Sequence, residues 1–173
     1  KGFDELIAVW AEINKVHPDW TLDIFGDGPL KEQFQDQIDS LRLSRAVKLR
    51  PAVKQIEQEY LNSSFLVLTS HYEGLPMVLL EAQACGLPLV AYACKCGPKD
   101  VIQDGKNGFL VAERDQETLI KKLLKLIEDG NLRKAMSHQS RIMSANFSED
   151  NVMKRWMGLF TELSVNLTES SKK

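Results

Sequence analysis

The sequence has 173 residues, of which 43% are hydrophobic and 27% are charged, so it has the size and apolar content of one domain with one sizeable core. Its 22 basic side chains nearly balance its 24 acidic ones. This balance provides no field that would attract nucleic acid or anionic lipid, and it argues against both as partners. No apolar run is long enough to cross a bilayer, and no signal-like segment opens the sequence. Because it starts at Lys1 without a methionine, we expect a piece of a longer protein.

The first part of the sequence alternates between helical and extended apolar periods. Residues 3–16 place their apolar side chains on one helical face, and residues 21–25 predict a strand that stops at a Gly-Asp-Gly turn. Pro29 is a favourable first residue for a second helix. A strand over 46–50 and a short helix over 54–62 follow. The inward face of the second helix is expected to consist of Leu30, Phe34, Ile38 and Leu41.

The central part contains the most apolar strands. Residues 65–69 and 88–92 are apolar at nearly every position, which is typical of strands that are covered on both faces. Residues 76–85, between them, predict a helix closed by a glycine. A short helical segment over 98–103 leads through an Asp-Gly-Lys-Asn-Gly turn to a strand over 109–111.

Three helices are expected to finish the chain, over 115–128, 131–145 and 149–164. Asp115 and Ser148 are residue types that accept hydrogen bonds from the free amides of a first helical turn, so we expect them to cap the first and last of these helices. Apolar residues on the last helix lead us to expect that it crosses toward another domain of a longer protein.

Strands that alternate with helices, with fully apolar central strands, predict an α/β fold: a Rossmann-like, doubly wound parallel sheet flanked by helices. We expect residues 1–165 to form this one domain and residues 166–173 to form a disordered tail. Ligands of such folds bind beyond the carboxyl ends of the strands. Three loops that follow strands should therefore open on one edge of the sheet.

The first of these loops contains Gly26, Asp27 and Gly28. Glycines permit close approach of a ligand to the backbone, so the loop is a candidate contact for a phosphate or a base. The alternative is a tight turn between a strand and a helix.

The second loop precedes the helix that holds Glu81, a carboxylate inside a nearly uniform apolar stretch. Lone carboxylates are rarely buried without a partner. The free amides of Met77 and Val78 at the start of the helix would attract an anion such as a diphosphate. The Glu81 carboxylate leans back toward the same end of the helix and could accept two hydrogen bonds from a ribose diol. The alternative is a solvated glutamate on the helix surface.

The third loop surrounds Gly97, whose neighbouring main-chain N–H groups could face phosphate or sugar oxygens. Lys99 could add positive charge there, or be solvated. His71, at a strand end, could orient a ligand or serve the structure alone.

The three cysteines do not form a disulfide framework. Cys94 and Cys96 could begin a metal site, but no second Cys/His pair stands at a zinc-like spacing. We therefore expect no metal site, and we interpret the cysteines as small residues in and after a strand.

The stretch "VLTSHYEGLPMVLLEAQACGLPLVAY" resembles the retaining glycosyltransferases of family 4, also called group 1, whose signature is a Glu-x7-Glu pair. The "GDGPL" and "DGKNGFLV" loops and the "KGFDELIAVW" start are similar to that family too. The resemblance covers essentially the whole chain. It implies the C-terminal, donor-binding half of a GT-B enzyme, whose N-terminal acceptor domain is absent from this sequence.

The resemblance also implies roles for individual residues. Glu81 is similar to the glutamate that binds the ribose hydroxyls of the nucleotide, and Glu73 to the one that contacts the transferred sugar. The residues after Glu73 would lie at the diphosphate: Gly74, Leu75, Pro76, Met77 and Val78. Lys1 is similar to a lysine that neutralises the leaving diphosphate, and the family's arginine would lie upstream of it. Glu73 would orient the sugar and would not act as a covalent nucleophile.

Two departures from the family pattern concern the donor. The family often has glycine where Pro51 stands, which bears on base contacts near Ala52 and Val53. The Cys96–Asp100 segment replaces a common Gly-Gly-x-x-Glu loop and resembles a branch that uses UDP-galactose or UDP-N-acetylhexosamine to build surface polysaccharides. The sequence has no Asp-x-Asp motif, so a metal-held diphosphate is not expected.

The resulting expectation is a metal-independent hexosyltransferase without a cofactor. Its donor would be UDP-linked and its acceptor a saccharide or a lipid-linked saccharide. It would act in the cytoplasm, with the inner face of the membrane as the alternative place for the full-length protein. Two alternatives remain, a non-catalytic nucleotide-binding module and a GT-B epimerase that acts on a UDP-sugar.

Overall fold

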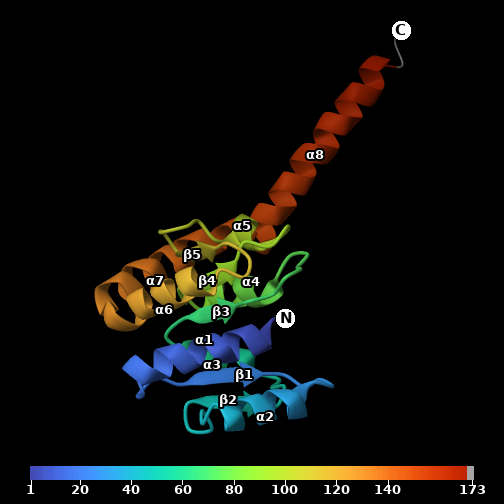
Figure 1. Ribbon diagram of the computed structural model, residues 1–173. Helices are drawn as coiled ribbons and strands as arrows, with labels where there is room; N and C mark the ends of the chain where they lie inside the picture. Colours follow the sequence, from blue (N-terminus) through green and yellow to red (C-terminus); the bar gives the residue numbers. More distant parts are fainter. Residues whose placement is uncertain (171–173) are drawn as a thin grey trace.

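The computed structural model describes residues 1–170 of the chain, with side chains through Ser164. Helices and strands alternate along the chain (Figure 1). Their order is α1 (Phe3–Val16), β1 (Leu22–Phe25), α2 (Lys31–Ser40), β2 (Val47–Arg50), α3 (Ile56–Leu61), β3 (Leu66–Leu68), α4 (Met77–Ala84), β4 (Leu89–Tyr92), α5 (Pro98–Val101), β5 (Gly108–Val111), α6 (Gln116–Glu128), α7 (Gly130–Ser144), η1 (Ala145–Phe147) and α8 (Glu149–Ser170).

The strands are parallel and form two hydrogen-bonded groups. β1 pairs with β2, and β3, β4 and β5 form a second group in that order. Parallel strands need crossover connections, and here a helix lies between each pair of successive strands. The predicted α/β, Rossmann-like class is therefore confirmed, with the sheet divided into two parts between β1 and β3.

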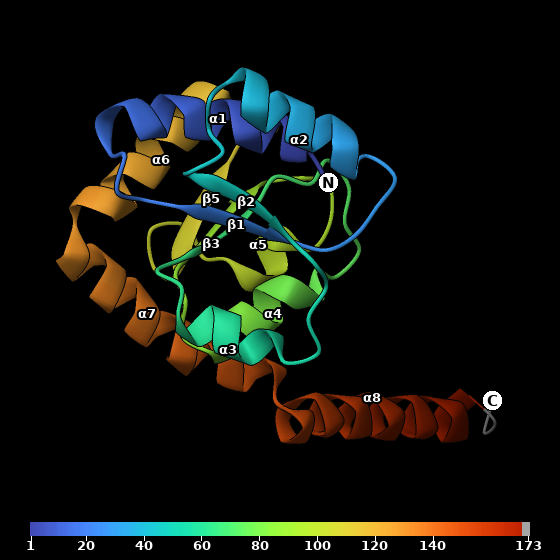
Figure 2. The ribbon, with the colours of Figure 1, turned by 90° about the horizontal axis from the view of Figure 1, so that it is seen from below.

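Helices cover both faces of the strands (Figure 2). α1, α2 and α6 lie on one face, and α3, α4 and α7 lie on the other. The larger core joins α1 and α6 to β1, β2, β4 and β5, and a smaller core lies between α4 and the second group of strands. β4 is buried at each of its four positions, as expected for a central strand covered on both faces.

The second helix differs from the prediction at both ends. Pro29 is not its first residue, because the helix begins at Lys31, whose amide donates to the Gly28 carbonyl oxygen at 3.2 Å. The side chains of Leu30 and Leu41 are exposed, whereas Ile38 is fully buried. The helix packs over only the two-stranded part of the sheet, so its ends extend beyond the core and its apolar face is shorter than predicted.

Aspartates cap two of the late helices. Asp115 accepts a hydrogen bond from the Thr118 amide at 2.9 Å, as predicted. Asp129 caps α7 in the same way through the Leu132 amide, also at 2.9 Å, and the sequence analysis missed it. Ser148 caps α8 with a longer contact, 3.4 Å from the Asn151 amide.

The last helix projects away from the rest of the molecule (Figure 1). α8 extends to Ser170, past the end predicted at 164, and residues 171–173, the end of the predicted disordered tail, lie outside the described residues. Its exposed apolar side chains are Met153, Trp156, Met157, Leu159, Phe160 and Leu163. That this face contacts another domain stays a prediction. Within the described residues, no helix is long and apolar enough to cross a membrane.

Candidate functional site

Loops at the carboxyl ends of β3 and β4 touch each other. Gly97 has a φ of +87°, and a Cβ at this position would lie 2.3 Å from the Gly74 carbonyl oxygen and 2.4 Å from the Pro76 Cδ. Real Cβ atoms do not approach so closely, so only glycine fits here without displacement of the neighbouring loop. The second and third predicted loops therefore meet, and Gly97 is the contact between them.

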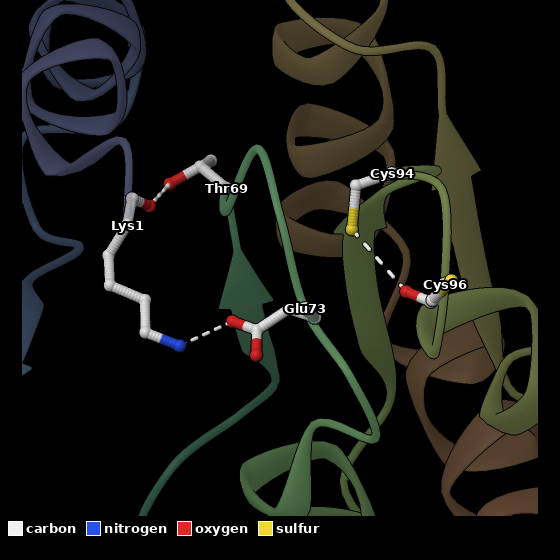
Figure 3. Close-up of polar contacts among 5 residues, drawn as sticks. All are labelled: Lys1, Thr69, Glu73, Cys94 and Cys96. Atoms are coloured by element: carbon white, nitrogen blue, oxygen red, sulfur yellow. Dashed lines mark hydrogen bonds and ion pairs between the residues drawn. The ribbon is translucent and has the colours of Figure 1, made fainter.

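Lys1 and Glu73 form an ion pair at this edge. The Lys1 Nζ donates to the Glu73 Oε1, and the Glu73 side chain is only 10% exposed whereas that of Lys1 is 55% exposed (Figure 3). The Thr69 hydroxyl donates to the carbonyl oxygens of Lys1 and Gly2, at 3.2 and 2.9 Å. These two bonds hold the start of α1 against the end of β3. Two residues that are 72 positions apart in the chain thereby come together.

The Glu73 carboxylate is held in its charged form. Partial burial acts to raise its pKa, but the hydrogen bond from Lys1 and the Lys1 charge outweigh burial, so the pKa lies below the usual 4.5. At neutral pH the site therefore presents an ammonium group paired with a carboxylate. A ligand phosphate could take over the ammonium group, and ligand hydroxyls could donate to the carboxylate.

Glu81 has a partner that the sequence analysis did not identify. The Tyr60 hydroxyl, from α3, donates to the Glu81 Oε2 at 3.0 Å. Burial raises the pKa of Tyr60, and the hydrogen bond to the Glu81 carboxylate raises it further, so the phenol remains a donor at neutral pH. Neither interpretation of Glu81 from the sequence named a protein partner. A tyrosine 21 positions upstream, on another helix, leaves no local sequence signal.

The first turn of α4 leaves amides available for a ligand. The Leu79 amide donates to the Pro76 carbonyl oxygen at 2.9 Å, and no backbone acceptor is found for the amides of Met77 and Val78 within the described residues. Both side chains are exposed. Free amides at a helix N-terminus, together with the helix dipole, favour a negatively charged group, so this helix end keeps the anion-binding potential that its sequence predicted.

Asp27 joins the first loop to the segment after β2. Its Oδ1 accepts from the Lys31 Nζ at 2.9 Å, and its Oδ2 accepts from the Ala52 amide at 3.2 Å. The hydrogen bonds from Lys31 and Ala52 hold the pKa of Asp27 below its usual value. The Ala52 amide is therefore engaged by Asp27, and the base contact predicted there would have to come from other atoms.

A cavity of about 680 Å³ opens at this edge and continues between β1 and β3. Six of the predicted site residues line it: Lys1, Gly26, Ala52, Val53, Val78 and Glu81. The remaining predicted site residues do not line this cavity: Glu73, Asp27, Gly28, Gly74, Leu75, Pro76, Met77 and Gly97. Glu73 still adjoins it through its ion pair with Lys1.

Comparison with known proteins decides the family. Residues 1–143 match the family model described as glycosyl transferases group 1. The chain belongs to this family. An uncharacterized glycosyltransferase of Haemophilus influenzae is 36% identical over 159 residues, which are 92% of this chain and 45% of that protein.

Other members of the group 1 family are similar over most of the chain. The amylovoran biosynthesis glycosyltransferase AmsD of Erwinia amylovora is 33% identical and covers 90% of this chain. The crystal structure of a Staphylococcus aureus TarM variant in complex with fondaparinux, α-GlcNAc-glycerol and UDP superposes with a TM-score of 0.86 at 28% identity, over 91% of this chain and 32% of that one. The chain spans less than half the length of these two curated relatives.

This group 1 domain also has a partly buried polar cluster behind the site, of which the sequence analysis identified only His71. His71 stacks on the Tyr92 ring, with 6.5 Å between ring centroids, and its Nε2 lies 3.3 Å from the Glu5 Oε1. Glu5 comes from α1 and Tyr92 from the end of β4. His71 therefore joins the loop that carries Glu73 to α1 and β4. Of the two roles predicted for His71, this arrangement supports the structural one.

Cys94 and Cys96, in the third loop, contact each other through the Cys94 side chain and the Cys96 backbone. The Cys94 thiol is buried and donates to the Cys96 carbonyl oxygen at 3.6 Å (Figure 3). Burial raises the pKa of Cys94, so its thiol stays protonated at neutral pH. In the part of the chain that the structure describes, no group of three or more metal-ligating side chains gathers.

Proposed function

We propose that this domain is the donor-binding half of a retaining hexosyltransferase that takes its sugar from a UDP-sugar. The observation that carries the proposal is the arrangement at the carboxyl edge. The Lys1–Glu73 ion pair lies beside the unpaired amides of α4, and Glu81 lines the same cavity.

Each part of a UDP-sugar has a chemically suitable partner at this edge. The two α4 amides and the Lys1 ammonium group would bind the diphosphate, and Glu81 would accept hydrogen bonds from the ribose diol. Glu73 would accept from hydroxyls of the transferred sugar. Gly26 of the first loop and the Ala52–Val53 segment, which line the cavity, would contact the base.

The same groups suit the reaction. As the sugar–phosphate bond breaks, negative charge develops on the leaving diphosphate, and Lys1 and the helix amides would stabilise it there. The charge can thus be met by groups of this chain. The Glu73 carboxylate, held charged by Lys1, would orient the sugar.

The relatives support a saccharide acceptor. AmsD is named for amylovoran biosynthesis, and the TarM variant was crystallised with UDP and α-GlcNAc-glycerol. We therefore propose surface polysaccharide synthesis in the cytoplasm, with UDP-hexose or UDP-N-acetylhexosamine as donor. A lipid-linked acceptor would place the full-length enzyme at the inner face of the membrane.

Calorimetric titration of residues 1–173 with UDP and with UDP-N-acetylglucosamine, in the presence of EDTA, tests the proposal. Both ligands should bind without a divalent metal. Glu81→Gln should lose on the order of tenfold in affinity for both ligands, because charge-assisted hydrogen bonds contribute about 1.5–3 kcal/mol each. Glu73→Gln should weaken the UDP-sugar and leave UDP nearly unchanged.

A matched control is Glu117→Gln, which removes an exposed carboxylate paired with Lys121 on α6 and should change neither affinity. A strict requirement for a divalent metal, or equal binding by Glu81→Gln and the unsubstituted chain, would contradict the proposed site.

A further inference from the structure

Alternate residues of the segment between β3 and α4 contact the start of α1. The Thr69 hydroxyl donates to the Lys1 carbonyl oxygen at 3.2 Å, and the Glu73 carboxylate accepts from the Lys1 Nζ (Figure 3). Between these two contacts along the segment, the His71 Nε2 lies 3.3 Å from the Glu5 Oε1. The segment that carries Glu73 is therefore joined to α1 at three points.

The His71–Glu5 contact lies in a more buried place than most ion pairs of this chain. The Glu5 side chain is only 18% exposed, and burial together with the nearby Glu5 charge raises the pKa of Tyr92. The His71 ring stacks on the ring of this tyrosine. Polar contacts of partly buried groups are not readily replaced by water, so Glu5 and Tyr92 together hold the histidine in place.

Donor binding would change the partner of Lys1 but not that of Glu5. In the proposed function the Lys1 ammonium group binds the diphosphate, which competes with Glu73 for it. Glu73 must then be kept within reach of the sugar hydroxyls by contacts that the donor does not use. His71 stands two positions before Glu73, and neither His71 nor Glu5 lines the cavity. Their contact can therefore persist while a nucleotide is bound.

We propose that His71 and Glu5 are positioning residues for recognition of the transferred sugar. Their contact holds the segment so that the Glu73 carboxylate stays at the sugar when Lys1 turns to the diphosphate. This inference rests on the proposed function. Because neither residue touches the donor, loss of their contact should weaken recognition of the sugar and leave recognition of the nucleotide intact.

The ratio of UDP-sugar affinity to UDP affinity, measured by calorimetric titration of residues 1–173, tests the proposal. The sugar nucleotide is whichever of UDP-glucose, UDP-galactose and UDP-N-acetylglucosamine binds best. His71→Phe keeps a ring over Tyr92 but removes the nitrogen that faces Glu5, and Glu5→Leu removes the carboxylate. Each variant should lower the ratio about fivefold or more, and the double variant should lower it no further, because the two residues share one contact.

Two further variants separate positioning from a general effect on the fold. Glu5→Gln keeps an acceptor oxygen and should restore most of the ratio that Glu5→Leu loses. In a chain that already carries Glu73→Gln, His71→Phe should cause no additional loss, because it acts through the Glu73 carboxylate. Thermal melts detect a general loss of structure, and the two Glu5 variants decide the question if His71→Phe does not fold.

A second histidine–glutamate pair, at the opposite end of α1, provides matched controls. The His17 Nε2 lies 3.1 Å from the Glu128 Oε1, which joins the end of α1 to the end of α6, and neither residue lines the cavity. His17→Phe and Glu128→Leu remove the same kind of contact far from Glu73. Both should leave the ratio of affinities unchanged.

The outcomes distinguish this inference from the proposed function. An unchanged ratio in His71→Phe and Glu5→Leu would overturn the inference alone. So would a loss of equal size in the two controls, or a full additional loss when His71→Phe is added to Glu73→Gln. If the unsubstituted chain bound neither UDP nor any UDP-sugar, the proposed function would be overturned, and this inference with it.

Discussion

Glu73 and Glu81 stand eight positions apart, but each has a different protein partner. Glu73 pairs with Lys1 from the start of α1, and Glu81 accepts from Tyr60 on α3. The local sequence predicted that both carboxylates lie near the carboxyl edge, because one precedes α4 and the other lies on it. It could not supply their partners, since Lys1 and Tyr60 are distant in the chain and are common residue types.

The hydrogen bond from Tyr60 to Glu81 should contribute to the stability of the fold. Tyr60→Phe removes the hydroxyl and leaves a partly buried carboxylate with one donor fewer. We expect a loss of about 1.5–3 kcal/mol in the free energy of unfolding, because hydrogen bonds to charged groups contribute this much. Urea denaturation measures it. Tyr72→Phe, at a side chain that is 76% exposed, is the control and should be neutral. Equal stability of the two variants would show that the Tyr60–Glu81 bond contributes nothing in solution.

The Lys1–Glu73 pair makes stability depend on pH. A carboxyl group whose folded-state pKa is lowered adds stability at pH values above its unfolded-state pKa, and this contribution is lost as the pH falls through the folded-state value. Because the pKa of Glu73 lies below 4.5, the stability difference between the unsubstituted chain and Glu73→Gln should be largest at neutral pH. It should shrink as the pH falls below about 4.

Thermal melts of both chains between about pH 7 and pH 3 provide the measurement. Glu117→Gln, which removes an exposed carboxylate on α6, serves as the reference, because an exposed ion pair contributes little to stability. A difference for Glu73→Gln that stayed constant over this range would contradict the electrostatic explanation.

Among the elements, strands were easier to predict than helix ends. β4 was evident from its short continuous apolar run, which is typical of a strand covered on both faces. The second helix was less evident. Leu30 and Leu41 fit its apolar period but extend beyond the part of the sheet that the helix covers. Periodicity describes one face of a helix and not the extent of the surface on which it packs.

The contact between the loops after β3 and β4 depends on Gly97. Gly97→Ala would place a Cβ at a positive φ and within 2.3 Å of the Gly74 carbonyl oxygen. We expect a loss of about 2 kcal/mol or more in stability, from backbone strain together with displacement of the loop. Weaker UDP-sugar binding should accompany it, since the displaced loop begins with Glu73.

Gly105→Ala separates the two causes. Gly105 also has a positive φ, +77°, but a Cβ there would meet nothing within 4 Å. This variant should lose only about 1 kcal/mol, the cost of a left-handed backbone in a residue with a side chain, and it should bind UDP-sugar normally. If thermal melts showed equal losses for both variants, the loop contact would have no energetic weight.

Across the whole molecule, the sequence predicted the class of fold and the edge that carries the site, and the comparisons confirmed the family. The division of the sheet between β1 and β3 was not predicted. Local patterns identify a strand and its covered faces, but they do not specify which strand edges are left unpaired. The same limit applies to α8, whose apolar side chains were evident although its projection from the domain was not.

The extent of the chain leads to a prediction about catalysis. Residues 1–173 cover 45% of the Haemophilus influenzae relative, and the groups identified at the carboxyl edge suit the donor alone. Transfer also requires an acceptor hydroxyl held close to the sugar, since much of the rate of such reactions comes from positioning the two reactants. We therefore expect the isolated chain to bind a UDP-sugar and to transfer no sugar to saccharide acceptors.

A radiolabelled UDP-sugar incubated with the isolated chain and a panel of saccharide acceptors tests this expectation, with the full-length protein under the same conditions as the positive control. Slow release of the sugar to water is compatible with a donor site that lacks an acceptor, because water can take the place of the hydroxyl. Labelled oligosaccharide formed by residues 1–173 alone would show that the acceptor is held by this chain. The exposed surface around Lys1 and Glu73 would then have to bind both substrates.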